Sequence, residues 1–212
     1  MADQTSSGTP GVSDIVSEYQ RRSWRRVSLV VLAAAALFTT IVIDIMTGPA
    51  TLDFWRVVQV VFAPGSASPK EALIVWDLRM PVALMAVAVG AMLGIAGAEM
   101  QTILNNPLAD PFTLGLSSAA SFGAAVAITM GVSIIPGVGG LLVTVNAFVF
   151  ACLASGALFL FTRLRGVTPE AMILVGIAML FTFNALLAFL QYGATELELA
   201  QLIFWQLGSL AR

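Results

Sequence analysis

A short polar turn between two long apolar stretches is the feature that most constrains the fold of this chain. The turn has the sequence Asn105-Asn106-Pro107-Leu108-Ala109-Asp110-Pro111. The stretches on either side, residues 81–104 and 112–132, are each close to the ~20 apolar residues that cross a bilayer. Because proline and asparagine interrupt helices, the turn is expected to join two membrane-spanning helices as a hairpin.

Composition places the chain in a membrane. Hydrophobic residues make up 58% of it and charged residues only 10%, whereas soluble domains carry about 25% charged residues. The formal net charge is −2, and no Lys/Arg-rich face exists beyond one short cluster, so we expect membrane lipid rather than nucleic acid as a partner. The chain has no histidine and a single cysteine, Cys152, so it forms no internal disulfide, and we expect no zinc or haem site in it.

Helix breakers such as Gly48-Pro49, Pro136-Gly137 and Thr168-Pro169 divide the apolar sequence into segments. Residues 1–20 are polar, and we expect a disordered cytoplasmic tail there. The membrane domain covers residues 21–212, with spans at about 27–46, 81–104, 112–132, 138–162 and 171–193. A short outer helix with an aromatic interface anchor is expected at 195–210. The predicted fold is an all-α integral membrane protein, a polytopic helical bundle of about five transmembrane helices.

Arginines set the expected orientation, because cytoplasmic loops are enriched in Lys and Arg. We place the N-terminus inside on the cluster before the first span, Arg21, Arg22, Arg25 and Arg26. Five spans then put loop 163–170 inside, with Arg163 and Arg165. Loop 47–77, with an amphipathic helix around Leu52–Phe62, and the C-terminus lie outside. Three basic residues that are predicted outside oppose this rule: Arg56, Lys70 and Arg79. A cleaved signal peptide is the alternative for the first span, but its apolar run exceeds the usual 7–15 residues.

Small residues recur at every fourth position on both helices of the predicted hairpin. The first stripe is Ala86, Gly90, Gly94 and Ala98, and the second is Gly115, Ala119, Gly123 and Ala127. Such stripes let helix backbones approach closely in lipid, where van der Waals contact drives association. We expect helix packing from them, and no particular activity.

The sequence carries no recognisable catalytic site. No histidine is available as a base for a nucleophile, and the carboxylates are scattered rather than paired on one helical face. The phosphate-binding pattern Gly-x-x-x-x-Gly-Lys-[Ser/Thr] is absent, so any ATP that drives this protein must bind another chain. We therefore expect a non-enzymatic membrane protein without a cofactor of its own.

Several motifs, in the same order, resemble those of one family. They are Leu78-Arg79-Met80-Pro81, Gly97-Ala98-Glu99-Met100-Gln101, the turn Asn106–Pro111, Leu114-Gly115-Leu116-Ser117-Ser118-Ala119-Ala120, Leu174-Val175-Gly176-Ile177-Ala178 and Phe204-Trp205-Gln206-Leu207-Gly208-Ser209-Leu210. From about Trp24 to its last residue, the chain resembles the permease subunits of bacterial ABC importers for iron-siderophores, haem and vitamin B12, the FecCD family. Members have about twice as many spanning helices, so the resemblance implies the N-terminal half of a ten-helix fold.

The resemblance implies a permease subunit in the bacterial inner membrane with three kinds of partner. These are ABC ATPase subunits that hold ATP and Mg²⁺, a periplasmic or lipid-anchored substrate-binding protein, and a second permease subunit, identical or different. In the family, arginines at the outer mouth face acidic residues of the binding protein. Arg79 matches the first of them, whereas the second position is Val82. An interface anchor paired with Asp77 is the alternative for Arg79.

Further site residues follow from the same resemblance. The translocation pathway and its gates are expected at Thr168, Pro169, Asn184, Gln191, Trp205, Gly208 and Ser209. Structural alternatives exist, because Thr168 is suited to cap a helix and intramembrane amides can bridge helices. We favour bridging for Asn146. The turn Asn106–Pro111 is a candidate ATPase contact, but we favour a structural role in which its Asn and Asp cap backbone groups.

Two functions are consistent with these residues. The first is a permease subunit that translocates a ferric siderophore or similar metal chelate by alternating access, driven by separate ATPase subunits. The second is a truncated, transport-inactive membrane fragment with a structural or interaction role. The sequence does not distinguish siderophore, haem and cobalamin, and the ferric siderophore is chosen as the commonest substrate of the family.

Overall fold

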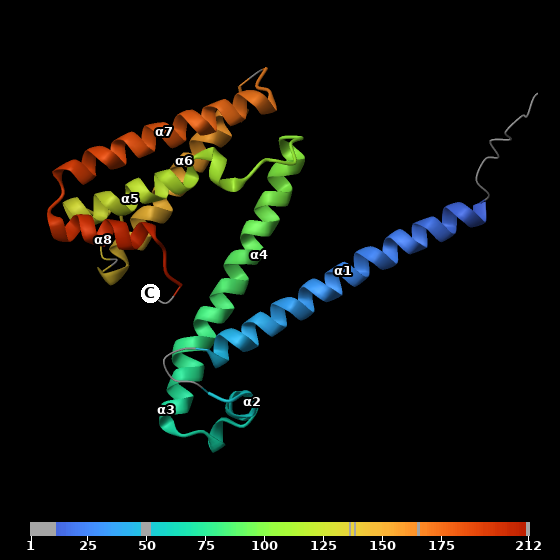
Figure 1. The fold of residues 1–212 in the computed structure, drawn as a ribbon. Coiled ribbons are helices and arrows are strands. Elements are labelled where there is room, and N and C mark those ends of the chain that lie inside the picture. The colour runs from blue at the N-terminus through green and yellow to red at the C-terminus, as the bar shows by residue number, and fades with distance from the viewer. Residues whose placement is uncertain (1–11, 48–51, 136, 138, 165, 211–212) are drawn as a thin grey trace, which may run out of the picture. The chain divides into compact units, whose positions relative to one another are not determined.

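The computed structural model describes all residues except 1–11, 48–51, 136, 138, 165 and 211–212. The part of the chain so described consists of helices and loops and contains no β-strand, which confirms the all-α prediction (Figure 1). It divides into two units, Met1–Leu84 and Met85–Arg212, and each unit is described by itself.

The first unit begins with α1, a single helix over Val12–Met46. The sequence predicted a disordered tail through residue 20, and the structure differs from that prediction at residues 12–20, which are helical; the rest of the tail lies outside the described residues. Extending an existing helix is easy once it has nucleated on the apolar stretch. Glu18 and Arg22 support this extension with an i,i+4 ion pair of 2.6 Å.

Four short helical elements follow α1 and span Asp53–Arg79; we call this part the outer segment, after the side of the membrane on which the sequence predicts it. They are α2 (Phe54–Phe62), η1 (Pro64–Ser66), α3 (Pro69–Ala72) and the π-helical η2 (Leu73–Arg79). The helix expected around Leu52–Phe62 is therefore confirmed as α2. The predicted breaker Gly48-Pro49 lies outside the described residues.

The core of the first unit gathers apolar side chains from each of its main elements. Ile45 comes from the end of α1, Val57 and Val60 from α2, Val75 from η2 and Ala83 from α4. Val60 and Val75 have no exposed surface. Burying such side chains stabilises by about 1.5–3 kcal/mol each, so this small core fixes α2 against the end of α1.

The helix α4 (Met80–Ile103) continues from η2 without a break, so that Pro69–Ile103 is one helical stretch. The π-helical turns end two residues before Pro81. In an unbroken α-helix the proline ring would clash with a carbonyl one turn earlier, and a widened turn relieves that clash. The sequence placed the beginning of the second span at residue 81, and the helix itself begins twelve residues earlier.

The second unit is built around α5 (Leu116–Met130). It also contains η3 (Pro111–Leu114), η4 (Gly139–Leu141), α6 (Leu142–Thr162), α7 (Pro169–Gly193) and α8 (Glu196–Gln206). Small residues of α5 are buried: Ala119, Gly123, Ala124, Ala125 and Ala127. The Phe122 ring of α5 meets Phe150 of α6 edge-on at 5.2 Å and Phe183 of α7 at 6.0 Å. This helix is therefore the centre of the second unit.

Four of the described helical stretches are long and apolar enough to cross a membrane: Glu18–Met46, Pro69–Ile103, Gly139–Thr162 and Pro169–Gly193. The expected third span at 112–132 is the shorter α5. Its 15 residues rise about 22 Å, less than the ~30 Å hydrocarbon core. Residues 112–114 form a 3₁₀ turn instead, because Gly115 with φ 73° separates them from α5. The breaker at Pro136 lies outside the described residues.

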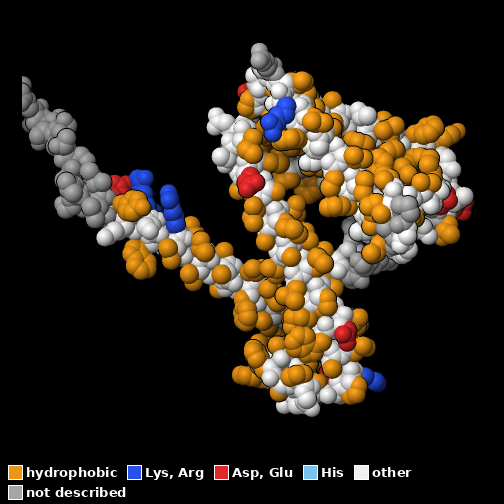
Figure 2. Space-filling view, turned by 180° about the vertical axis from the view of Figure 1, so that it is seen from behind, with side chains coloured by type: hydrophobic (Ala, Val, Ile, Leu, Met, Phe, Trp, Pro, Cys, Tyr) orange, Lys and Arg blue, Asp and Glu red, His pale blue; other side chains and the backbone are white. Residues whose placement is uncertain are grey.

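Most large apolar side chains of the long helices face outward. Figure 2 shows hydrophobic side chains over most of the surface, with few charges between them. Leu29 and Phe38 of α1, Met92 of α4 and Phe189 of α7 are each more than 60% exposed. Exposure on this scale fits a lipid environment, in which apolar side chains are solvated by acyl chains.

Asn146 is the buried polar side chain of α6 and has no exposed surface. Its Nδ2 donates to the carbonyl of Val132 at 2.6 Å, and its Oδ1 accepts from the N–H of Ile134 at 3.1 Å. These bonds tie α6 to the loop that follows α5. Asn146 therefore bridges α6 to a loop, whereas the prediction had it bridging two helices.

Candidate functional site

The polar turn ends α4 with a Schellman motif. Asn105 has a left-handed backbone, φ 46°, and its N–H bonds to the carbonyl of Thr102 at 3.3 Å. The N–H of Asn106 bonds to the carbonyl of Gln101 at 3.1 Å. The two bonds satisfy carbonyls that the helix end leaves without partners. Asparagine is, after glycine, the residue that best tolerates this backbone conformation.

Two side chains organise the rest of the connector, as we call Asn105–Gly115. Asn106 Oδ1 accepts from the N–H of Leu108 at 2.9 Å, and Asp110 Oδ1 accepts from the N–H of Phe112 at 2.7 Å, which caps η3. The capping role predicted for Asn and Asp is confirmed. Leu108, in contrast, is 85% exposed and is open to contact from outside the chain.

The connector packs against α7 through two glycines. A Cβ added to Gly176 would lie 2.8 Å from Leu114 Cα, and one added to Gly115 would lie 2.6 Å from the backbone nitrogen of Leu180. Real Cβ atoms do not approach so closely, so a side chain at either position would push the connector away from α7. Gly115 also has φ 73°, which favours glycine. Two of the motifs singled out in the sequence thus meet at one backbone contact.

The predicted gate residues Thr168 and Pro169 form the start of α7. Thr168 Oγ1 accepts from the N–H of Ala171 at 3.3 Å, and Pro169 occupies the first helical position, where its missing N–H is harmless. In the loop before them, the Arg163 guanidinium lies 4.8 Å from the centre of the Phe159 ring. Arg165 lies outside the described residues. The N-cap role of Thr168 is confirmed, and its gate role stays a prediction.

The two amides predicted for the pathway lie along α7. Asn184 is exposed and Gln191 is half-buried. They are about 10 Å apart along the helix axis, and Thr168 is about 24 Å before Asn184, by the ~1.5 Å rise per residue. The structure therefore distributes these residues over the length of one helix and does not collect them in one cavity.

The short helix expected at 195–210 is α8, and its place on the outer side stays a prediction. Thr195 and Glu198 form a capping box at its start, and Leu202 is fully buried against Leu187 and Leu190 of α7. The three predicted pathway residues lie at its end: Trp205 is half-buried, Gly208 has φ 77°, and Ser209 is exposed. A glycine-favouring backbone and the bond from Gly208 N–H to the Trp205 carbonyl, 3.0 Å, end the helix here.

The two small-residue stripes differ in what surrounds them. Gly123 lies so close to α6 that an added Cβ would be 2.6 Å from the Asn146 carbonyl oxygen. For Gly90 and Gly94 of α4, an added Cβ would meet no atom of the described residues within 4 Å. Gly94 borders a shallow hollow of about 310 Å³ that is also lined by Gly97, Gln101 and Asp110. The α5 stripe packs helices together, whereas α4 presents its stripe outward.

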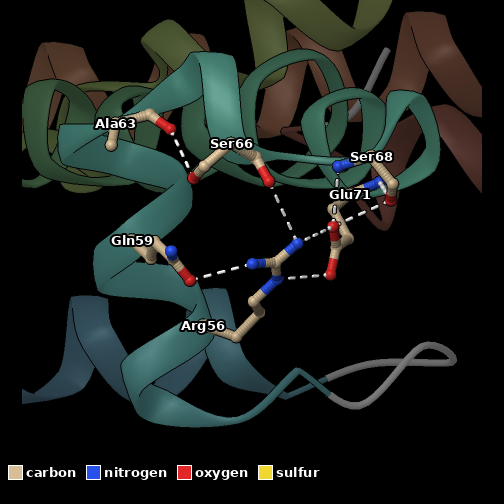
Figure 3. A network of polar contacts seen from close by, with 6 residues as sticks. All are labelled: Arg56, Gln59, Ala63, Ser66, Ser68 and Glu71. Carbon is tan, nitrogen blue, oxygen red and sulfur yellow. Dashed lines mark hydrogen bonds and ion pairs between the residues drawn. The ribbon is translucent and has the colours of Figure 1, made fainter.

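An ion-pair network holds the outer segment together (Figure 3). Arg56 of α2 donates from Nε and Nη2 to the two oxygens of Glu71 in α3, both at 2.7 Å. It also donates to Gln59 Oε1 at 2.8 Å and to the Ser66 carbonyl at 3.3 Å. The hydrogen bond with Glu71 raises the pKa of Arg56. Four acceptors around one guanidinium fix α2, η1 and α3 relative to one another.

The sequence did not indicate that Arg56 and Glu71 would be partners in this network. The pattern Ser68-Pro69-Lys70-Glu71 is a recognisable capping box, and Glu71 Oε2 does accept from Ser68 N–H at 2.8 Å. Nothing local indicated that Arg56, fifteen residues earlier, would join it.

Among the described residues, no three His, Cys, Asp or Glu side chains are grouped to hold a metal ion.

Arg79 lies at the junction of η2 and α4. Its side chain is half-buried, and Nη1 donates to the backbone carbonyl of Ile45 in the last turn of α1. This contact fixes one nitrogen of the guanidinium within the first unit. Docking of a partner protein by Arg79 stays a prediction.

Residues 31–212 match the FecCD transport family. The chain belongs to that family. A protein named as an ABC transporter permease, MJ0087 of Methanocaldococcus jannaschii, is 35% identical to it over 211 residues, which cover 94% of this chain and 58% of that protein. The vitamin B12 import permease BtuC of Yersinia enterocolitica is 35% identical over 142 residues, which cover 64% of this chain and 40% of BtuC.

A solved structure supports the same relationship at the level of the fold. It is described as a metal-chelate type ABC transporter in an inward-facing conformation, and it matches this FecCD chain with a TM-score of 0.69 and 28% identity. The match covers 87% of this chain and 54% of that one. The chain spans about half the length of the relatives it matches. The predicted family and fold are confirmed, and the chain is a multi-pass membrane protein.

Proposed function

We propose that this chain forms the N-terminal half of a permease that imports a metal chelate through the inner membrane of a bacterium. The observation that carries the proposal is its membership in the FecCD transport family over residues 31–212. Relatives named for vitamin B12 import and for metal-chelate transport support a large chelate as the substrate class. Within that class we propose a ferric siderophore or a similar complex.

The composition supports a chelated metal rather than a free metal ion as the substrate. The chain has no histidine and one cysteine, so it offers few of the ligands that bind transition metals in proteins. A chelate carries its own ligands and meets the protein through apolar and hydrogen-bonding contacts. The exposed Asn184 and half-buried Gln191 of α7 are suited to such contacts.

The energy for transport comes, in this proposal, from ATP bound with Mg²⁺ to separate ATPase subunits. An external binding protein delivers the substrate, and a second permease subunit completes the pathway. Alternating access requires an element whose position is coupled to nucleotide and to ligand. The connector meets α7 at Gly115 and Gly176, so a displacement of the connector by the ATPase would be carried directly to the helix that bears Asn184 and Gln191.

Deletion of the gene that encodes this chain, followed by uptake measurements with labelled substrates, tests the proposal. We expect loss of energy-dependent uptake of a ⁵⁵Fe-siderophore, with uptake restored by the wild-type gene. Loss of ⁵⁷Co-cobalamin uptake alone would keep the permease function and correct the substrate. Unchanged uptake of siderophore, haem and cobalamin, with no second system in the strain, would refute the proposal.

A further inference from the structure

Four arginines lie on α1 where its apolar stretch begins: Arg21, Arg22, Arg25 and Arg26. The apolar stretch, residues 27–46, rises about 30 Å and so matches the hydrocarbon core of a bilayer. The helix continues through the arginines without a break, and Arg21 is only about 9 Å before Val27 along the axis. All four side chains are therefore held at the level of the lipid headgroups.

The arginines share one side of the helix. At about 100° per residue they fall within an arc of roughly 140°. All four are exposed, and the basic side chains of α1 can be seen beside its long hydrophobic stretch in Figure 2. Between residues 18 and 27 the charges are four arginines and one acid, Glu18, which gives +4 − 1 = +3. Glu18 is paired with Arg22 at 2.6 Å.

Aromatic side chains mark the same level of the helix. Trp24 is 73% and Tyr19 is 74% exposed. Together with Gln20, Ser23 and Val27 they line a hollow of about 360 Å³ on α1. Tryptophan and tyrosine are enriched at membrane interfaces, where one part of the ring contacts acyl chains and another contacts water. The four arginines lie at the same depth as Trp24 and Tyr19, and together these side chains form a surface suited to lipid headgroups.

We infer that this turn of α1 binds the phosphate groups of anionic phospholipids in the leaflet that it enters. Guanidinium groups match phosphate oxygens with paired hydrogen bonds. Each Lys or Arg near an anionic membrane surface strengthens binding to that surface by a factor of roughly five. The helix fixes the backbone of this segment in advance, so less backbone freedom is lost on binding than in a disordered basic segment. The inference rests on α1 crossing the membrane and is independent of the transported substrate.

Tryptophan quenching by brominated lipids tests this inference in the full chain. Trp55, Trp76 and Trp205 are replaced by Phe, which leaves Trp24 as the reporter, and the protein is placed in phosphatidylcholine nanodiscs. Brominated phosphatidylglycerol or brominated phosphatidylcholine is then added at equal mole fractions. We expect phosphatidylglycerol to occupy the Trp24 site at least fivefold more strongly at low salt, and the preference to fall in 0.5 M NaCl.

Charge variants provide the controls. Replacing all four arginines by Gln should abolish the preference, whereas replacing them by Lys should keep most of it. Glu18→Gln should raise it, because Arg22 is released from its ion pair. A version with Trp205 as the only tryptophan should show no preference. Both leaflets of the nanodisc have one composition, so an inverted orientation would not change the result. Equal quenching by the two lipids, or a preference that survives the Gln variant, would overturn the inference.

Discussion

Arg79 Nη1 donates a hydrogen bond to the backbone carbonyl of Ile45. Ile45 lies in the last turn of α1, where carbonyls lack partners within the helix and carry partial negative charge. A guanidinium satisfies such a carbonyl and interacts favourably with the helix dipole. The residue that the family resemblance connects with docking of a binding protein is therefore also a link between the end of α1 and the start of α4.

We predict that Arg79→Met lowers the stability of the protein, because it removes a charge-assisted hydrogen bond at a half-buried site, worth about 1.5–3 kcal/mol. Thermal unfolding in detergent micelles measures the change. Arg79→Lys, which keeps a charge and a donor, should lose less. Equal stability of Arg79→Met and wild type would show that the Ile45 contact does not hold the first unit together.

Arg79→Gln tests the docking role of Arg79 separately from its effect on stability, because glutamine keeps a hydrogen-bond donor but loses the charge. If Arg79 also faces acidic residues of a binding protein, the affinity of that protein for the permease in nanodiscs should fall, and its dependence on salt should weaken. Unchanged affinity for a folded Arg79→Gln variant would leave the arginine with its structural role alone.

The glycine contact between the connector and α7 gives a second prediction. Gly176→Ala would place a methyl group 2.8 Å from Leu114 Cα, and overpacking of this kind destabilises by about 1–3 kcal/mol. Gly156→Ala in α6 is the matched control, since nothing lies within 4 Å of its added Cβ; alanine there should be neutral or stabilising by up to ~1 kcal/mol. Similar unfolding temperatures for the two variants would contradict the close contact.

Local sequence signals account for a large part of this structure. Asn105 and Pro107 end one helix, Thr168 begins another, and the apolar stretches between them identify the long helices of the chain. Such features depend on neighbours in sequence, so propensity and turn chemistry are sufficient to predict them. The polar turn at the end of α4 was predicted for the same reason, although the helix that follows it, α5, is shorter than the span expected there.

Long-range contacts were not predictable in this way. Gly115 and Gly176 are far apart in sequence, and no local pattern shows that their backbones touch. Arg56 and Glu71 likewise pair through the arrangement of α2 and α3. The stripes at Gly94 and Gly123 look alike in the sequence, yet only the second meets a neighbouring helix in the described chain, because packing depends on the surroundings of a helix as well as on its own residues.

Asn146 gives a third prediction. Asn146→Leu preserves size but removes both hydrogen bonds to the loop after α5, and two bonds at ~0.5–1.5 kcal/mol each predict a loss of about 1–3 kcal/mol. Asn184→Leu, at an exposed position of α7, is the comparison for stability and should change it little. Unfolding curves of both variants give the answer. If Asn146→Leu were as stable as Asn184→Leu, the bridging role would be wrong.

A fourth prediction concerns the ion pair in the outer segment. Arg56→Gln and Glu71→Gln should each lower the unfolding temperature slightly, and the double variant should lose less than the sum of the two, because both single changes break one interaction. The pair is partly exposed, so the coupling should shrink at high salt. Additive effects at low salt would mean that the pair contributes nothing to holding α2 on α3.

The proposed permease role requires that the connector and the outer segment face opposite sides of the membrane. In a Cys152→Ala background, single cysteines at Ser66 and Leu108, both exposed, can be treated in intact cells with a membrane-impermeant maleimide. We predict labelling of Ser66→Cys in intact cells and labelling of Leu108→Cys only after the membrane is permeabilised. Labelling of Leu108→Cys in intact cells, or the same accessibility at both positions, would contradict an arrangement in which the connector faces the ATPase and the outer segment faces the incoming substrate.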